Sequence, residues 1–336
     1  MARIGMIGAG SWGTALAAHL ARCGHKVEVW SIMKDETDMI NNTHQQSVKL
    51  PGVVLDDSVT ASTDLEEVMR DKDMLVLAVP SAFVRSTARS MAKYCRYGQL
   101  IVSVAKGIEE DTLLTMTEVI KQEIPHCEAA VLCGPTHAEE VGIGLPTAIV
   151  AGAARREVAE YIQSVFMGKT FRVYTSPDML GMQVGAALKN VIALAAGCSD
   201  GLGCGDNTKA ALITRGIAEI SQIGTLMGGK PATFSGLTGI GDLIVTCASM
   251  HSRNRRAGIL IGKGMTADEA MKEVKQVVEG VYSAKAALQL ADKYEVEAPI
   301  IRAVNRVLFG NEAPGMAVED LMLREGKTES DDHDWC

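Results

Sequence analysis

A glycine-rich stretch near the N-terminus has the spacing of a loop that binds a dinucleotide. Gly8-Ala-Gly10-Ser11-Trp12-Gly13 directly follows the β-branched run Arg3–Ile7 and opens a helical pattern. In such a turn the first glycine permits the tight bend, the second lets a pyrophosphate approach the backbone, and the third lets the helix pack on the strand. The unpaired N–H groups at the helix start then face the phosphates. The motif therefore predicts that this loop, Ser11 and Trp12 included, binds NAD or NADP; the alternative is a tight turn that binds nothing.

The preference between the two cofactors depends on the end of the second predicted strand. An NAD enzyme usually has an acid there, which holds the ribose 2′-hydroxyl, whereas an NADP enzyme places an arginine nearby. Here Glu28 lies inside the strand, Asp35 comes late, and Val29–Lys34 contains no arginine. Ser31 or Lys34 could contact a 2′-phosphate, or either could simply be solvated. The sequence leaves both cofactors open.

The first half of the chain alternates short β-branched runs with longer amphipathic runs. Met74–Val79 is continuously apolar, as expected of a strand that is covered on both faces of a parallel sheet. The alternation predicts an α/β fold with a doubly wound, Rossmann-like sheet over residues 1–178. The expected strands are Arg3–Ile7, Lys26–Trp30, Met74–Val79, Leu100–Val104, Ala129–Leu132, Thr147–Val150 and Phe171–Tyr174. The expected helices are Ser11–Cys23, Asp64–Arg70, Ser81–Tyr94, Thr112–Glu123 and Arg155–Met167.

After Pro177 the β-rich runs give way to long Ala/Leu/Ile segments at helical spacing, punctuated by glycines and prolines. The second domain, residues 179–326, is therefore predicted to be all-helical and to bind the substrate. Residues 327–336 are polar and acidic, and we expect a flexible tail there. The expected helices are Met179–Ala196, Thr208–Met227, Arg253–Ile261, Thr266–Val274, Val281–Tyr294 and Ile300–Leu308.

Composition and charge exclude several classes of protein. The 41 acidic residues outnumber the 33 basic ones, which argues against a nucleic-acid or anionic-membrane surface as the main partner. None of the eight cysteines forms a CxxC pair or has a histidine at zinc-ligand spacing, so we expect reduced cytosolic thiols and no metal site. The N-terminus lacks the apolar core of a signal peptide, and apolar stretches such as Val191–Ala196 are too short to span a bilayer. These features predict a cytoplasmic protein without membrane insertion.

Beyond the glycine loop, four long motifs and one short motif follow one another along the chain. They are Ser103-Val-Ala-Lys106-Gly-Ile-Glu109; Gly134-Pro-Thr136-His-Ala138-Glu-Glu-Val141; Gly185-Ala-Ala-Leu-Lys189-Asn190-Val-Ile with Ser199-Asp-Gly-Leu-Gly203; Gly239-Ile-Gly-Asp242-Leu-Ile-Val-Thr246-Cys with Ser252-Arg253-Asn254-Arg255; and Val277-Val-Glu279-Gly280. Several long motifs in one order are far more specific than any single one. With them the chain resembles bacterial-type NAD(P)-dependent glycerol-3-phosphate dehydrogenase over almost its whole length. Ile32 departs from that family, in which arginine is common at this position, and this bears on the NADPH preference.

The resemblance implies NAD(P)H-dependent, reversible reduction of dihydroxyacetone phosphate to sn-glycerol 3-phosphate, which supplies glycerophospholipid synthesis, and it implies a homodimer. Reducing a ketone needs a hydride at carbon and a proton at the oxygen that develops negative charge. Lys189 is the expected proton donor, because it lies in the apolar helical run Val184–Ala196, where desolvation lowers the pKa of an amine. A lone lysine would more often extend from the helix to water. The flanking motif favours the catalytic role.

The same resemblance assigns the substrate contacts. Asp242 and Thr246 lie four residues apart, so both face one side if the stretch is helical, and the carboxylate could hold the Lys189 ammonium. Asp242 could equally begin a helix as its N-cap. Ser252-Arg253-Asn254 would open another helix, where the dipole and a forked donor suit the substrate phosphate. By composition alone, Arg253 belongs to an ordinary solvated cluster.

The remaining expected contacts come from both domains. Lys106 follows a buried strand at the edge where open α/β sheets bind ligands, and the resemblance lets it touch both cofactor and substrate. Glu279 is expected to contact the cofactor, although it could be a surface charge. The full substrate set is Lys106, Gly134, Thr136, Lys189, Asn190, Asp242, Thr246, Ser252, Arg253 and Asn254. The cofactor set beyond the glycine loop is Lys106, Ala138, Arg253, Val277 and Glu279.

Two other functions fit part of the pattern. A hydroxy-acid dehydrogenase can combine a Rossmann domain with a helical domain, but its site would bind a carboxylate. A regulator could bind NAD(P) without chemistry, and a degraded catalytic set would then be expected. The set of Lys189, Asn190, Asp242, Arg253 and Asn254 is intact, which favours the dehydrogenase of a phosphorylated substrate.

Overall fold

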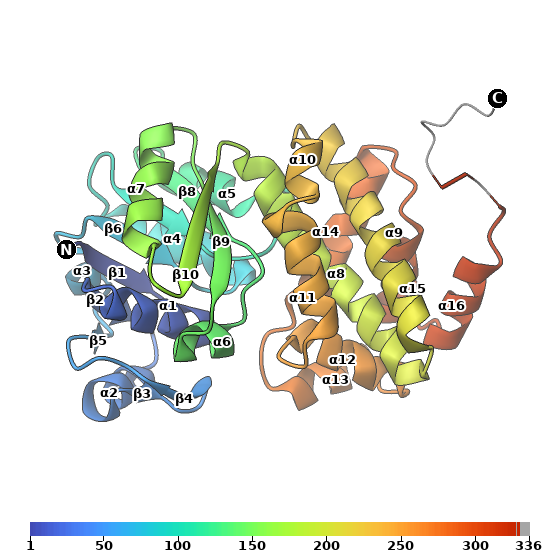
Figure 1. Cartoon of the computed structure of the whole chain (residues 1–336), viewed down its shortest axis with the longest axis horizontal. Helices are drawn as coiled ribbons and strands as arrows, with labels where there is room; N and C mark the ends of the chain where they lie inside the picture. The colour runs from blue at the N-terminus through green and yellow to red at the C-terminus, as the bar shows by residue number, and fades with distance from the viewer. Residues whose placement is uncertain (327, 330–336) are drawn as a thin grey trace.

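A sheet-based N-terminal domain and a helical C-terminal domain lie side by side in the chain (Figure 1). The structure, a computed structural model, describes residues 1–326, 328 and 329. The expected flexible tail, residues 327–336, therefore lies outside the described residues except for Thr328 and Glu329. The strands end at Ser176, and from Met179 onward the regular elements are helices.

The N-terminal domain is built on an eight-stranded sheet, whose strands are β1 (Arg3–Ile7), β2 (Lys26–Trp30), β5 (Thr60–Ser62), β6 (Met74–Leu77), β7 (Leu100–Ser103), β8 (Glu128–Cys133), β9 (Thr147–Gly152) and β10 (Phe171–Ser176). Their order is β10-β9-β8-β7-β6-β1-β2-β5. β1 pairs in parallel with both β2 and β6, so the chain order reverses between β1 and β6. The predicted Rossmann-like fold is confirmed. β8 and β9 pair antiparallel, so β9 and β10 run opposite to the other six strands, a feature that alternating patterns cannot reveal.

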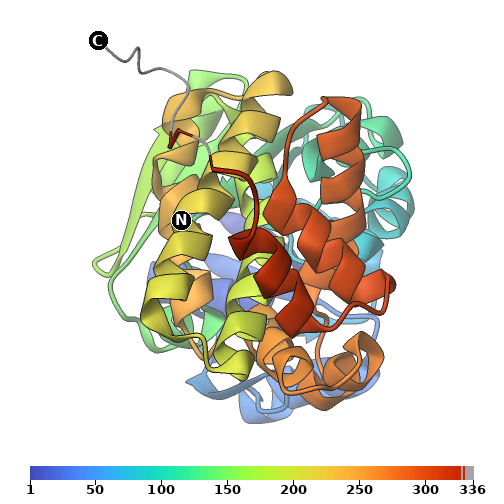
Figure 2. The same ribbon diagram turned by 90° about the vertical axis from the view of Figure 1, so that its right-hand side faces the viewer.

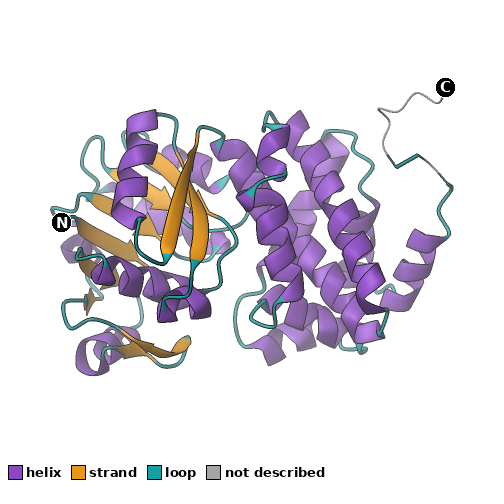
Figure 3. Cartoon of the chain, viewed as in Figure 1, coloured by secondary structure: helices purple, strands orange, loops and turns teal. Residues whose placement is uncertain are grey.

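Both faces of the sheet are covered, as the continuous apolar run in β6 predicts (Figure 3). Met74 and Val76 pack into the layer with α1, α6 and α7, whereas Leu75 and Leu77 pack into the layer with α3, α4 and α5. Period-2 alternation along a strand produces this division. The helices of the two layers are α1 (Ser11–Arg22), α3 (Leu65–Met69), the 3-10 helix η1 (Ser81–Phe83), α4 (Val84–Ala92), α5 (Met116–Glu123), α6 (Ala138–Ile143) and α7 (Arg156–Phe166).

The segment between β2 and β5 contains elements that the sequence pattern did not reveal. They are α2 (Lys34–Thr43) and the hairpin of β3 (Gln45–Gln46) and β4 (Leu50–Val54). α2 buries only Thr37 and Ile40, so it leaves little apolar periodicity to detect. The predicted helix Thr112–Glu123 begins later, at Met116, because Thr115 and Glu118 form a capping box.

The helical domain is arranged around α8 (Met179–Leu202), which contacts α9 (Gly205–Leu226), α12 (Arg253–Gly262) and α14 (Glu279–Lys293). Figure 2 shows this domain in front of the sheet domain, with α9 in yellow and the last helices in red. The other elements are α10 (Pro231–Phe234), the π-helical turn η2 (Leu237–Gly241), α11 (Asp242–Ala248), α13 (Ala267–Val274), α15 (Pro299–Phe309) and α16 (Pro314–Met322).

α8 corrects one expectation from the sequence. We expected no apolar stretch long enough to cross a bilayer, but α8 has 24 residues and a mean hydropathy of 1.4 over its most apolar window. Glycines and polar residues divide the α8 sequence into short apolar pieces, so its sequence does not read as one long apolar stretch. In the structure 83% of that window is buried inside the protein, so α8 is the core helix of the domain rather than a membrane span.

Candidate active site

The carboxyl ends of β1, β6, β7 and β8 lie at one edge of the sheet, because these strands are parallel. The glycine loop follows β1, Ser81 comes soon after β6, Lys106 follows β7, and Gly134 follows β8. Open α/β sheets bind ligands at this edge, where the strand order reverses. The sheet thus brings four separate sequence segments to one place.

The glycine loop has the shape that a dinucleotide requires. Gly8 has a φ of +123°, and a Cβ added at Gly13 would lie 2.1 Å from the Gly8 carbonyl oxygen, so both positions need glycine. A Cβ added at Gly10 would meet nothing within 4 Å, which leaves open space in front of the first turn of α1. The indole N–H of Trp12 is buried without a partner among the described residues. Open space, exposed helix-start N–H groups and a spare donor fit a diphosphate.

Lys189 lies at the centre of the polar cluster that connects the two domains. It is 4% exposed on α8, and its Nζ donates to Asp242 Oδ1 and, at 2.5 Å, to Thr246 Oγ1, both on α11. The Thr246 hydroxyl in turn donates to the Asp242 carbonyl oxygen at 2.6 Å. Asp242 is fully buried at the first position of α11. The four-residue spacing therefore does place both side chains on one helical face.

Lys106 brings the sheet domain into the same cluster. Its Nζ donates to Asp242 Oδ2 at 2.8 Å and to the Gly134 carbonyl oxygen at 3.0 Å. One carboxylate thus holds two ammonium groups, and the cluster carries a net positive charge. Each ammonium has three N–H donors and uses two of them in these short bonds. The third donor of Lys189 makes only a long contact of 3.5 Å with the Asp242 carbonyl oxygen, so each ammonium can still donate to a substrate oxygen.

Burial changes the acid strength of Lys189. Removal from water lowers the pKa of its ammonium to about 8, against the opposing attraction of Asp242, and the nearby Lys106 ammonium lowers it further. An amine with this pKa can both give and take a proton near neutral pH. The neighbouring His137 has a pKa that is lowered by burial and by Lys189, and its Nε2 lies 3.4 Å from the Val245 carbonyl oxygen.

The expected phosphate-binding residues lie at the start of α12. Ser252 is the N-cap, and its Oγ accepts from the Arg255 backbone N–H at 3.2 Å, so the predicted helix start is present. Asn254 donates to Asn190 Oδ1 at 2.9 Å and accepts from the Gly280 N–H at 2.8 Å. Burial lowers the pKa of the Arg253 guanidinium, while the adjacent Glu279 opposes this shift. Arg253 is therefore not the solvated charge that composition alone suggested.

Glu279 makes a second connection between the domains, through a residue that sequence reasoning missed. Its carboxylate accepts from the Ser81 backbone N–H at 3.1 Å and from the Ser81 hydroxyl at 2.5 Å. Burial raises the pKa of Glu279, so it is not the surface charge that we considered as the alternative. Ser81 carries no motif of its own; only its position after a strand of the ligand-binding edge could have indicated it.

The remaining expected residues surround these two connections. Thr136 donates to the Gly134 carbonyl oxygen at 3.1 Å, and Ala138 begins α6, partly buried. Val277 is half-buried just before α14. Among the described residues no hydrogen bond joins Ser252 or Val277 to the Lys189–Asp242 cluster, so their expected roles depend on ligands.

The chain matches two family models in succession. Residues 3–159 match the N-terminus of NAD-dependent glycerol-3-phosphate dehydrogenase, and residues 178–319 match its C-terminus. The chain belongs to the NAD-dependent glycerol-3-phosphate dehydrogenase family. The resemblance inferred from the motifs is thereby confirmed, and the chain is an oxidoreductase rather than a cofactor-binding regulator.

Individual members of the family resemble this chain over nearly its whole length. A curated relative from Agathobacter rectalis, glycerol-3-phosphate dehydrogenase [NAD(P)+], is 62% identical over 335 residues and covers 100% of both chains. The crystal structure of the enzyme from Coxiella burnetii is 35% identical, with a TM-score of 0.93 over 96% of this chain and 99% of that one. The enzyme from Saccharomyces cerevisiae is 25% identical, with a TM-score of 0.81, and covers 96% of this chain and 99% of its own.

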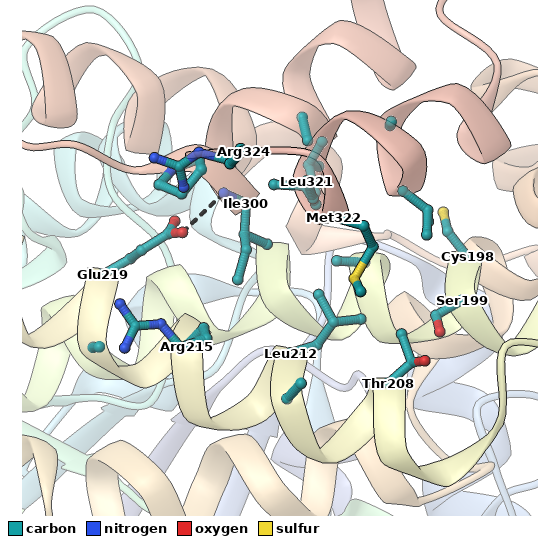
Figure 4. A pocket seen from close by; sticks show the side chains of 18 of the residues that line it. Cys198, Ser199, Thr208, Leu212, Arg215, Glu219, Ile300, Leu321, Met322 and Arg324 are labelled. Carbon is teal, nitrogen blue, oxygen red and sulfur yellow. Dashed lines mark hydrogen bonds between the residues drawn. The ribbon is translucent and has the colours of Figure 1, made fainter. Parts of the chain in front are cut away.

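One cavity of the helical domain lies away from the predicted site. A space of about 600 Å³ lies between α8, α9, α15 and α16, and none of the predicted site residues lines it (Figure 4). Leu212, Ile300 and Leu321 form part of its walls, and Glu219 accepts from the Ile300 N–H at 2.8 Å. Burial raises the pKa of Glu219 to about 7, but its carboxylate is occupied in capping the start of α15. The described residues that line the cavity include no converging ammonium groups, which a ketone reductase needs.

Proposed function

We propose that this protein reduces dihydroxyacetone phosphate to sn-glycerol 3-phosphate, reversibly, with NADH or NADPH. The observation that carries the proposal is the buried Lys189 ammonium, held by Asp242 and Thr246 beside Lys106. A bound nicotinamide supplies or accepts the hydride. The protein must then supply a proton to the ketone oxygen, and Lys189 is the side chain whose pKa and burial suit that task.

The proton step follows from the hydrogen bonds of the cluster. Asp242 fixes the direction of the Lys189 ammonium, and Thr246 accepts from a second N–H. The third N–H makes only a 3.5 Å contact with the Asp242 carbonyl oxygen, so it can turn to the substrate carbonyl instead. As the oxygen becomes negative, the excess positive charge of Lys189 and Lys106 around Asp242 stabilises it. In the oxidation direction the neutral amine takes the proton from the hydroxyl. Because the cluster is buried, it performs this step with little solvent reorganisation.

The phosphate of the substrate is expected at the start of α12. The helix N-terminus and the Arg253 guanidinium supply positive charge there, and Asn254 is fixed by Asn190 and Gly280. Lys106, Gly134 and Thr136 line the opposite, sheet-domain side of the site. A hydroxy-acid substrate has no phosphate, so it would leave the positive charge at the start of α12 without a partner.

The cofactor would lie over the glycine loop. Gly8, Gly10, Ser11, Trp12 and Gly13 are expected to hold its diphosphate, since the loop has open space and unpaired donors at this point. Nearer the helical domain, the contacts are expected from Lys106, Ala138, Arg253, Val277 and Glu279.

The broader biology follows the same proposal. We propose that the enzyme works in the cytoplasm, where it supplies glycerol 3-phosphate for glycerophospholipid synthesis. We further propose that it is a homodimer. Residues 1–178 would form the dinucleotide-binding domain and residues 179–326 the substrate-binding domain, and each would add contacts to the ligand of the other. Light scattering during size-exclusion chromatography tests the dimer, which a mass of one chain would rule out.

A single assay tests the reaction. Purified protein is mixed with NADH or NADPH, dihydroxyacetone phosphate is added, and the cofactor absorbance is followed. Oxidation that depends on the phosphorylated ketone, and not on dihydroxyacetone alone, is expected. No oxidation of either cofactor would exclude the proposed reaction.

A further inference from the structure

The corner after β2 lies directly beside the glycine loop. The Gly8 N–H donates to the Trp30 carbonyl oxygen at 2.9 Å, and Ser31, which follows, is only 4% exposed. From the other side, the buried Gln46 of β3 donates to the Ala9 carbonyl oxygen at 3.1 Å. The corner and the β3–β4 hairpin therefore surround the same part of the proposed cofactor site, where the adenosine ribose of a dinucleotide lies in this fold.

A carboxylate is fixed in this corner, although the sequence pattern did not single it out. Glu36, in the first turn of α2, accepts from the Ser31 hydroxyl at 2.6 Å and forms an ion pair with Lys49. Its side chain is 13% exposed. Lys49 is itself tied to the hairpin, because its backbone N–H donates to Gln46 Oε1 at 3.3 Å. Two separate elements thus hold one acidic group beside the glycine loop.

The cations of the corner are already paired. Lys34 binds Asp38 at 2.5 Å, and Lys49 binds Glu36. With Asp35, the corner contains three carboxylates against these two lysines. Beside the ion-paired Lys34, the tip of the corner carries two exposed apolar side chains: Ile32 is 78% exposed and Met33 is 53% exposed. A 2′-phosphate carries a charge of about −2 and needs cationic donors. A 2′-hydroxyl instead needs an acceptor, which a fixed carboxylate supplies.

We infer that Glu36 makes this enzyme select NADH over NADPH. Glu36 is the specificity-determining residue, because its carboxylate favours the ribose hydroxyl and disfavours a phosphate at the same place. Ser31 and Lys49 are positioning residues. Ser31 orients the Glu36 carboxylate, and Lys49 is paired with that carboxylate and so is not free to bind a phosphate. The inference depends on the proposed function only for the presence of a dinucleotide.

Cofactor binding without substrate tests the selection independently of turnover. The dissociation constants of NADH and NADPH are measured by the fluorescence of the reduced nicotinamide on titration with the full chain. We expect NADH to bind about tenfold more tightly or better, since like-charge juxtaposition disfavours the wrong ligand. Equal affinities, or tighter binding of NADPH, would overturn the inference.

Two variants assign the selection to this corner. Glu36→Gln keeps the size of the side chain and an acceptor for Ser31 but removes the charge and releases Lys49, so the NADPH affinity should rise and the selectivity should fall about tenfold. Ile32→Arg adds an exposed cation and should move the ratio in the same direction. The matched control is Glu160→Gln, which removes an ion-paired carboxylate from α7, on the side of the sheet near β10. A Glu36→Gln protein with the ratio of the Glu160→Gln control would overturn the role of Glu36.

The outcomes separate this inference from the proposed reaction. If both cofactors bind but dihydroxyacetone phosphate is not reduced, the selection is still measured and only the reaction fails. If neither cofactor binds, the dinucleotide site itself is absent and both fail. With active protein, the ratio of kcat/KM for NADH and NADPH should follow the ratio of affinities in every variant.

Discussion

At the scale of single residues, Asp242 connects the side chains of the proposed proton step. It holds Lys189 through one oxygen and Lys106 through the other, so both ammonium groups are fixed by one buried carboxylate. The motifs predicted that Lys189, Asp242 and Thr246 belong together. They did not predict that Asp242 also binds Lys106, because that lysine lies 136 residues away in the other domain and no periodic pattern relates them.

Replacing Lys189 tests its role most simply. Lys189→Met keeps the length and apolar stem of the side chain but removes the proton donor, so kcat should fall by about 10²–10⁴-fold, as for a lost general acid. Steady-state kinetics measures this, and circular dichroism checks that the protein is folded. Lys263→Met, at an exposed lysine that ends α12, is the control and should leave kcat unchanged. A Lys189→Met protein within a few-fold of wild type would remove Lys189 from the mechanism.

The lowered pKa of Lys189 sets opposite pH dependences for the two directions. Burial lowers the pKa to about 8, so the ammonium needed for ketone reduction is lost as the pH rises through that value. The rate of reduction, as kcat/KM, should therefore fall above about pH 8, whereas the rate of glycerol 3-phosphate oxidation should rise over the same range. The inflection should disappear in Lys189→Met. An inflection that persists in the variant belongs to another group.

At the scale of elements, close packing of α8 on α12 fixes the site. A Cβ added at Gly258 would lie 2.3 Å from the Leu194 carbonyl oxygen, and one added at Gly197 would lie 2.2 Å from the Arg255 carbonyl oxygen. The two backbones therefore nearly touch, and this contact connects the helix of Lys189 with the helix of Arg253. The sequence predicted both helices from their apolar periodicity, but not their contact, since glycines within helical runs do not say which partner they face.

Gly258→Ala should disturb this contact. The added methyl group forces α12 away from α8, so unfolding free energy should fall by about 1–3 kcal/mol, as for overpacking, and KM for dihydroxyacetone phosphate should rise because the start of α12 moves. Urea denaturation and kinetics measure the two effects. The control Gly315→Ala, in α16, adds a Cβ that meets nothing within 4 Å and should not destabilise. Stability and KM equal to wild type would show that the contact is less tight than described.

The glycine loop allows a second test at this scale. Gly10→Ala places a methyl group in the open space where the diphosphate is expected, so cofactor affinity should fall while the thermal midpoint stays near wild type. Gly13→Ala instead forces a Cβ against the Gly8 carbonyl oxygen and should lower the thermal midpoint. Fluorescence titration and thermal denaturation separate the two. Unchanged NADH affinity in Gly10→Ala would place the cofactor elsewhere.

Predictability also differed among the elements. The strands and most helices of the sheet domain could be predicted, because burial of one or two faces makes apolar residues recur at a regular spacing. The β2–β5 connection was not, since α2 buries only two residues and β3 has two residues in all. Glu36 lies in this connection, where no apolar periodicity indicates which polar side chains are held in place. The reversed direction of β9 and β10 depends on how the chain crosses the sheet, which local patterns do not encode.

At the scale of the whole molecule, the two domains meet through buried polar contacts. Lys106 binds Asp242, Ser81 binds Glu279, and Thr117 exchanges two further hydrogen bonds with Gln183 across the junction. The sequence predicted that both domains contribute to one site, but only the folded chain shows that charged side chains join them. Each of the first two contacts joins the carboxyl-end edge of the sheet to a helix of the second domain. Such a junction would bring the expected cofactor loop close to the proposed proton donor.

The most direct test of the account is a crystal structure with oxidised cofactor and dihydroxyacetone phosphate, a pair that cannot react. We predict that Lys189 Nζ lies within hydrogen-bond reach of the substrate carbonyl oxygen, about 2.6–3.2 Å, with the phosphate at the start of α12. A complex in which the carbonyl binds away from Lys189, or in which that ammonium points away from the nicotinamide, would contradict the proposed mechanism.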